Sequence, residues 1–119
     1  MGQLYYGNSD TRIDVPDRLL AHLKVVIATK LRRNESFMLS WTGDAADGRS
    51  SIWLQPAIPL RFVFDSADME ILNPQTVRDM ANNASSSAGL VVSLDQEIPQ
   101  AQRELRAVTN SMPRIKVPA

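Results

Sequence analysis

The sequence has no cysteine, a single histidine and no excess of either charge sign. Without cysteine the chain can form no disulfide, no thiolate metal site and no cysteine nucleophile. With one histidine, a histidine-rich metal site is excluded as well. The 13 basic residues are balanced by 13 acidic ones, so net charge alone does not predict nucleic-acid binding. We therefore expect no metal site and no cofactor.

Long apolar runs are also missing, since none approaches the roughly 20 residues that a membrane-spanning helix needs. The first ten residues, MGQLYYGNSD, lack the basic and apolar regions of a secretory signal. With 44% hydrophobic and 22% charged residues, the chain is too apolar to be wholly disordered. We expect a cytoplasmic protein with no membrane partner.

Hydrophobic periodicity predicts the element order ββαβββαβ. Two helices are expected to begin at Pro16 and Pro74, because a first helical residue needs no backbone N–H. Alternating or apolar segments predict strands at residues 3–6, 11–15, 36–41, 51–55, 60–64 and 89–94. This order indicates an α+β fold, in which a small antiparallel or mixed sheet of about five or six strands carries both helices on one face.

The composition changes after residue 94. We expect one α+β domain over residues 1–94 and a C-terminal extension over residues 95–119. Within this extension a helical spacing of apolar residues predicts a short helix, followed by a proline-containing tail. The apolar residues are Ala101, Leu105, Val108 and Met112.

Basic residues gather on one predicted face of the first helix. Arg18, His22, Thr29 and Arg33 share this face, and Arg32 flanks it. No acidic residue interrupts the face, so one interpretation is a stripe that binds an anion or nucleic acid. The alternative is a solvated outer face, whose basic residues near the C-terminal end of the helix interact favourably with the helix dipole. His22 is not predicted to be a catalytic base, because no orienting carboxylate or nucleophile lies nearby in the sequence.

The segment 42–51 is rich in Gly, Asp and Ser and connects two predicted strands. Asp44, Asp47 and Gly48 resemble part of a calcium-binding loop, but the remaining acidic ligands of an EF-hand are missing. An Asp-Gly hairpin turn explains the same residues without a metal. Arg49 follows this turn and is a further candidate for anion binding.

Aromatic residues lie on the middle strands and could form a core or a surface on which bases stack. Trp53 differs from the others because its neighbours Ile52 and Leu54 point to the opposite face of their strand. If these neighbours are buried, Trp53 lies on the open face of the sheet. Together with Met38 and Arg61, it is a candidate partner surface.

Motifs of well-known catalytic sites are absent. The sequence contains no GxxxxGK[ST] phosphate loop, no GxGxxG, no GxSxG and no HExxH. Carboxylates are scattered singly rather than paired. We therefore predict no catalytic residues.

Four segments resemble a family of short, uncharacterised actinobacterial proteins, many of which are labelled "ATP-dependent DNA ligase". They are MGQLYYGNS, LAHLKVVI, KLRRNESF and GRSSIWLQPAIPL, and the resemblance extends over residues 1–94. The family usually has histidine where this chain has Gln55, and it brings no established active-site residues. A ligase forms its adenylate on a lysine within Lys-x-Asp/Asn-Gly, a motif that Lys24, Lys30 and Lys116 do not fit. The chain is also too short for a two-domain ligase, so we expect the label not to describe its activity.

These observations favour a small non-catalytic binding or assembly module. It would present the basic helix face or the aromatic sheet face to nucleic acid or to a protein, including a second copy of the chain. The alternative is an enzyme or ligand-binding protein for a phosphorylated or nucleotide substrate. That alternative requires His22, Arg32, Arg33 and Arg49 to converge in one pocket.

Overall fold

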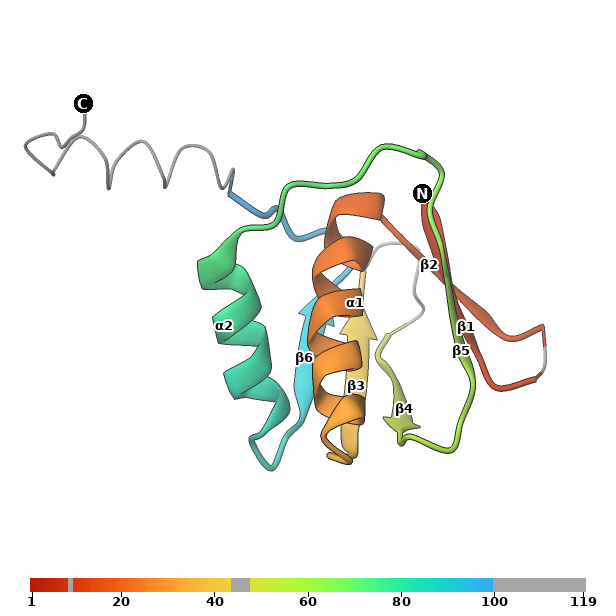
Figure 1. The fold of residues 1–119 in the computed structure, drawn as a ribbon, viewed down its shortest axis with the longest axis vertical. Coiled ribbons are helices and arrows are strands. Elements are labelled where there is room, and N and C mark those ends of the chain that lie inside the picture. The colour runs from red at the N-terminus through yellow and green to blue at the C-terminus, as the bar shows by residue number, and fades with distance from the viewer. Residues whose placement is uncertain (9, 44–47, 100–119) are drawn as a thin grey trace, which may run out of the picture.

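A computed structural model describes residues 1–8, 10–43 and 48–99 of the 119-residue chain. The element order is the predicted one, and the α+β fold class is confirmed (Figure 1). The elements are β1 (Gly2–Tyr6), β2 (Arg12–Val15), α1 (Asp17–Arg32), β3 (Phe37–Thr42), β4 (Ser50–Leu54), β5 (Leu60–Val63), α2 (Pro74–Ala84) and β6 (Leu90–Ser93). The predicted C-terminal helix and the Asp44–Asp47 part of the calcium-like loop lie outside the described residues.

The six strands form two three-stranded sheets rather than the single sheet expected from the sequence. One sheet has the order β2-β1-β5 and is antiparallel, whereas the other has the order β4-β3-β6 with a parallel β3–β6 pair. Pro56 and Pro59 lie in the connection from β4 to β5, and proline supplies no N–H for a strand ladder. The hydroxyl of Tyr6 links the two sheets instead, donating to the carbonyl of Trp53 at 2.6 Å.

The helices follow the periodicity seen in the sequence. The apolar stripe of α1 is almost completely buried, with Leu19, Leu20, Leu23, Val26 and Ile27 each at most 1% exposed. Figure 1 shows α1 and α2 side by side on the same face of β3 and β6. In the described part of the chain, no helix combines the length and apolar character needed to cross a bilayer.

The core extends slightly beyond the predicted domain boundary at residue 94. Leu4, Ile13 and Val15 contribute to it from the first hairpin. At the other end of the domain, Ile98 is only 8% exposed and belongs to the same cluster. The stretch that follows β6 is therefore part of the folded body at least as far as this residue.

Gly89 allows the chain to enter β6 beside β3. Its φ of +77° is a left-handed conformation that most residues adopt only at a cost. A Cβ atom at this position would lie 2.5 Å from the carbonyl oxygen of Met38, and this backbone atom is held within the sheet. Gly7 has a similar φ of +74°, but a Cβ atom there would meet no other atom within 4 Å.

We expect Gly89→Ala to destabilise the domain more than Gly7→Ala. The left-handed backbone should cost both variants about 1 kcal/mol. The clash with β3 should raise the total loss for Gly89→Ala to about 3 kcal/mol. Urea denaturation of both variants measures the difference in their free energies of unfolding. Equal losses of stability would show that the close approach of residue 89 to Met38 does not exclude a side chain.

Candidate functional site

The guanidinium group of Arg18 makes hydrogen bonds within the protein. It donates to the carbonyl oxygens of Ile71 at 3.0 Å, Ile98 at 3.3 Å and Pro99 at 2.8 Å. The carboxylate of Glu70 lies 3.7 Å from the same group. The side chain thus ties the first turn of α1 to two other segments, and most of its donors are already used.

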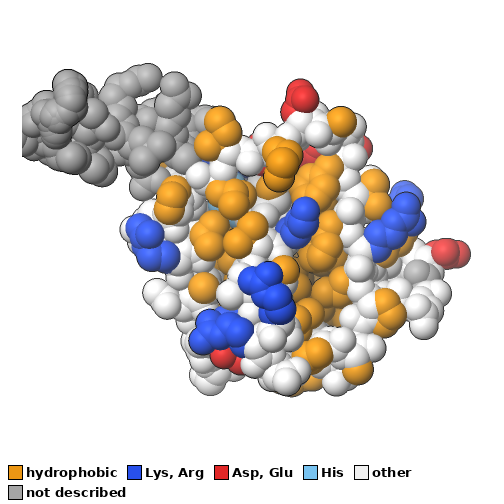
Figure 2. Space-filling model, viewed as in Figure 1, with side chains coloured by type: hydrophobic (Ala, Val, Ile, Leu, Met, Phe, Trp, Pro, Cys, Tyr) orange, Lys and Arg blue, Asp and Glu red, His pale blue; other side chains and the backbone are white. Residues whose placement is uncertain are grey.

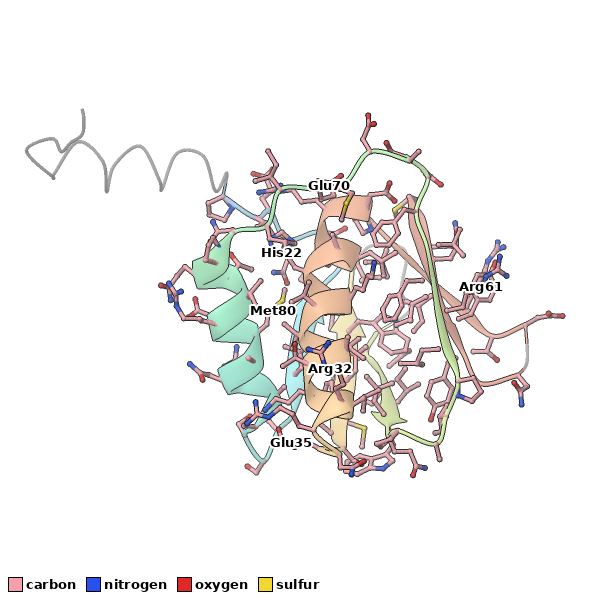
Figure 3. All side chains as sticks on the ribbon, in the orientation of Figure 1. His22, Arg32, Glu35, Arg61, Glu70 and Met80 are labelled. Carbon is pink, nitrogen blue, oxygen red and sulfur yellow. The ribbon has the colours of Figure 1, made fainter. Side chains whose placement is uncertain are left out.

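His22 is completely buried between α1 and the start of α2 (Figure 3). Its Nε2 atom accepts a hydrogen bond from the backbone N–H of Asn73 at 2.8 Å. Since Nε2 is an acceptor, the ring proton resides on Nδ1, which donates to the carbonyl of Arg18 at 2.7 Å. Both nitrogen atoms are therefore occupied, and the geometry specifies a neutral imidazole.

Burial lowers the pKa of His22 below its ordinary value of 6.5. Loss of hydration is the main cause, because a charged imidazolium is costly away from water. The hydrogen bond to the Arg18 carbonyl and the charge of Glu70 act in the opposite direction, while the Arg18 charge lowers the pKa further. The pKa shift and the hydrogen bonds thus both favour the neutral ring.

Asn73 is buried and completes a polar cluster with His22 and the partly buried Arg18, which we call the His22–Asn73 joint. Its side-chain oxygen caps α2 by accepting from the N–H of Thr76 at 3.1 Å. Its side-chain nitrogen donates to the carbonyl of Pro99 at 2.9 Å. The joint of Arg18, His22 and Asn73 therefore holds together α1, α2 and the last described residues.

The predicted basic stripe on α1 is not one exposed face, because His22 is buried and Arg18 is tied to carbonyl groups. Arg33 is exposed but lies 3.4 Å from the carboxylate of Glu35. Arg32 and Arg49 are exposed, yet they lie near opposite ends of the antiparallel β3–β4 pair. The residues that a nucleotide-binding pocket required are therefore not brought together.

Lys30 is a buried cation that the sequence analysis did not single out. Lys30 is only 8% exposed. Its ammonium group donates hydrogen bonds to the carboxylate of Glu35 at 3.1 Å and to the hydroxyl of Ser85. Lys30 lies four residues after Val26, which is buried on the core side of α1. That spacing was a signal in the sequence that Lys30 faces inward.

The predicted exposure of Trp53 and Met38 is found in the structure. They are direct cross-strand partners on β4 and β3, and they are 47% and 36% exposed. Val91 of β6 is 51% exposed and pairs with Ser40, which lies on the same face of β3 as Met38. We call these three apolar side chains, Met38, Trp53 and Val91, the Trp53 surface.

A hollow of about 400 Å³ adjoins the Trp53 surface. It lies where the C-terminal ends of both helices meet the start of β3. Met38 and Trp53 form part of its wall. The polar part of the lining comes from Lys30, Glu35, Ser36, Ser85, Ser86 and Ser87.

Arg61 is not part of the Trp53 surface. It lies on β5 in the other sheet, where its guanidinium is 5.5 Å from the centre of the Tyr5 ring. Figure 3 shows it pointing outward at the far side of the molecule from α2. The structure therefore unites two of the three predicted partner residues and separates the third.

The state of His22 and the placement of the acidic side chains decide what this arrangement can do chemically. The nitrogen atoms of His22 are both engaged, so the ring has no free position for proton transfer. Across the residues that the structure describes, no group of three His, Cys, Asp or Glu side chains is placed to hold a metal ion. The sheet of β4, β3 and β6 presents the Trp53 surface, and the neighbouring hollow contains the Lys30–Glu35 ion pair.

The fold and these features define a small α+β domain with a buried polar joint and an exposed aromatic surface. Residues 1–95 match the family model described as "Domain of unknown function (DUF7882)", and the chain belongs to this family. Comparisons with curated proteins and with solved structures give no match. Family membership assigns no role to individual residues, so the candidate site depends on the geometry alone.

The buried neutral state of His22 predicts that acid destabilises the domain. In the unfolded chain His22 gains a proton as the pH falls through 6.5, whereas the folded state resists protonation. This stabilising contribution is therefore complete above pH 6.5 and is lost as the pH falls towards the lower folded-state pKa. Urea denaturation at a series of pH values measures the effect.

His22→Gln is the matched control, because its side-chain oxygen can still accept from the Asn73 N–H but does not titrate. We expect this variant to lose about 1–3 kcal/mol at neutral pH, since the bond to the Arg18 carbonyl changes. Its stability should then vary little with pH until the carboxylates titrate near pH ~4. An unchanged pH slope in His22→Gln would show that another group is responsible.

Proposed function

We propose that this domain is a binding module that recognises an apolar segment of a protein partner at the Trp53 surface. The observation that carries the proposal is the paired exposure of Trp53 and Met38 beside the 400 Å³ hollow. Large apolar side chains that remain accessible side by side are typical of interaction sites.

The apolar character of the surface explains how binding would be driven. A tryptophan buries about 150–250 Å² when it is fully covered, and tryptophan is enriched among residues that dominate binding energy. The methionine side chain adapts to different shapes, which suits an irregular partner. The hollow beside these two residues would accept a side chain of the partner, with the serine hydroxyls available for its polar groups.

The charges favour protein over nucleic acid as the partner. Lys30 and Arg33 are both paired with Glu35, so the cations beside the hollow are already neutralised in part. Nucleic-acid binding depends mainly on cations that are free to contact phosphates. Arg32 and Arg49, the remaining exposed candidates, lie near opposite ends of the β3–β4 pair.

A DNA ligase activity, suggested by the labels of similar actinobacterial sequences, is not part of this proposal. Lys24 and Lys30 lie in α1 without the flanking residues of an adenylation motif, and Lys30 is buried in an ion pair. The enzyme alternative likewise receives no support from the separated positions of His22, Arg32, Arg33 and Arg49.

The proposal is tested by selecting binders for the full chain from a peptide library and measuring their affinity. The Trp41→Phe variant leaves Trp53 as the only tryptophan, so its fluorescence reports directly on the surface. We expect selected peptides to be apolar and to shift this fluorescence. Trp53→Ser should weaken their binding by about tenfold or more, as expected for a residue that contributes over 1.4 kcal/mol.

The matched control is Arg61→Ser, which removes a large exposed side chain from β5 in the other sheet. It should leave peptide affinity unchanged. Trp53→Ser should alter the free energy of unfolding by no more than about 0.5 kcal/mol, because the side chain is substantially exposed. Equal affinity of Trp53→Ser and the parent chain for every selected peptide would overturn the proposal.

Nucleic acid and self-association are separate outcomes of the same set of experiments. Fluorescence anisotropy with short single- and double-stranded DNA and RNA at two salt concentrations tests the first. Salt-sensitive binding that is lost in Arg32→Ala/Arg49→Ala, with no peptide binding, would favour nucleic acid instead. A concentration-dependent mass that falls to the monomer in Trp53→Ser would identify a second copy of the chain as the partner.

A further inference from the structure

A second apolar recess lies away from the Trp53 surface, on the face where α1 approaches β5. Figure 2 shows it as a recessed band of hydrophobic side chains. One end of the band is a hollow of about 170 Å³ between α1 and the connection from β5 to α2. Its apolar lining is formed by Ala21, Val25, Phe64, Ala67, Met69 and Leu72.

The size and exposure of this hollow suit a protein side chain better than a small molecule. Sites for small-molecule ligands usually enclose about 300–1,000 Å³, which is well above the volume found here. Met69 is 90% exposed and the adjacent Ile71 is 62% exposed. Met69, which lines the hollow, would lose water contact if another chain segment covered it.

The chain itself supplies a segment that begins beside this hollow. The carbonyl of Pro99, the last described residue, accepts from Arg18 and Asn73. Arg18 also donates to the carbonyl of Ile71, the residue directly before Leu72 in the hollow wall. The following residues, 100–119, therefore start within a few residues' reach of the hollow.

The connection on one side of the hollow is opposite in charge to this segment, while Lys24 of α1 lies on the other side. The connection 65–70 contains Asp65, Asp68 and Glu70 and no basic residue. Residues 100–119 contain four basic side chains and one acidic side chain. Asp65 is partnered with the N-terminal ammonium and Glu70 with Arg18, while Asp68 keeps an exposed carboxylate for a new ion pair.

We propose that the C-terminal segment 100–119 docks on this recess and places Leu105 or Val108 in the hollow. The apolar residues Ala101, Leu105, Val108 and Met112 follow a helical spacing, so one face of a helix would carry them all. A helix over these residues would be about 18 Å long, shorter than the roughly 24 Å of α1 along which it would lie. The proposal concerns a different surface from the proposed function and does not depend on it.

Docking of this kind is an intramolecular binding event. The tether at Pro99 holds the segment at a high effective concentration near the recess, so a modest contact area is sufficient. The segment would cover Met69 and the hollow in the resting protein. A partner that competes for the recess or for the segment would release it.

The test uses the full chain, isotope-labelled for NMR, with a nitroxide attached at Asn110→Cys. The natural sequence has no cysteine, so this is the single attachment point. We expect the label to broaden the amide signals of Ala21, Val25 and Met69, with peak heights reduced about twofold or more for a mainly docked segment. The amide signals of Ser51 and Trp53 should be unaffected.

Two variants separate docking from random contact. Leu105→Asp/Val108→Asp breaks the apolar face of the segment, and Met69→Asp places a charge at the rim of the recess. Both should restore the peak heights, and neither changes a buried residue of the described domain. Broadening that persists in both variants, or that is absent from Ala21, Val25 and Met69, would overturn the proposal.

A mixture of two samples identifies the molecule from which the docked segment comes. One sample is nitroxide-labelled chain at natural isotope abundance, and the other is isotope-labelled chain without a nitroxide. Docking within one molecule gives no broadening in this mixture. Broadening at Ala21, Val25 and Met69 in the mixture would show that the segment of a second copy occupies the recess and would overturn the intramolecular proposal. If no peptide binds at the Trp53 surface, the broadening at Ala21, Val25 and Met69 is still expected. Each proposal can therefore fail without the other.

Discussion

The hydrogen bond from the Asn73 amide to His22 is the constraint on which the arrangement of the domain depends. It requires a neutral imidazole with its proton on Nδ1, and it places the cap of α2 directly against the first turns of α1. Arg18 and Asn73 then hold the carbonyl of Pro99 at the same point. Three segments distant in the sequence are thereby fixed by one small set of polar groups, of which His22 and Asn73 are buried and costly to leave unpaired.

The division of the strands into two sheets has a direct effect on what the molecule exposes. Both helices cover one face of β3 and β6, so the opposite face of that sheet retains Met38, Trp53 and Val91 as accessible side chains. The Tyr6–Trp53 hydrogen bond fixes the backbone of β4 without covering its tryptophan ring. An exposed aromatic residue on a well-anchored strand loses little conformational freedom on binding, which favours recognition.

The element order and the apolar stripe of α1 could be predicted because they depend on local periodicity. The exposure of Trp53 could also be predicted, since alternation along a strand decides the face of each residue. The burial of His22 was not predicted because its neighbours Arg18 and Arg33 placed it on a basic outer face, and Lys30 was not assigned to any face. Yet His22 lies three residues after Leu19 and four before Val26, and both of these are buried. The hollows and the split sheet depend on contacts between segments far apart in the sequence, which no local pattern contains.

The parallel pairing of β3 with β6 also bears on how the domain is assembled during synthesis. Leu39 pairs with Leu90, so the chain between them must be closed into a long loop before this ladder can form. The β1–β2 and β3–β4 hairpins need only local contacts and can form earlier. Because β6 is the last strand in the described part of the chain, the sheet that carries Trp53 cannot be completed until nearly all of the described residues have left the ribosome.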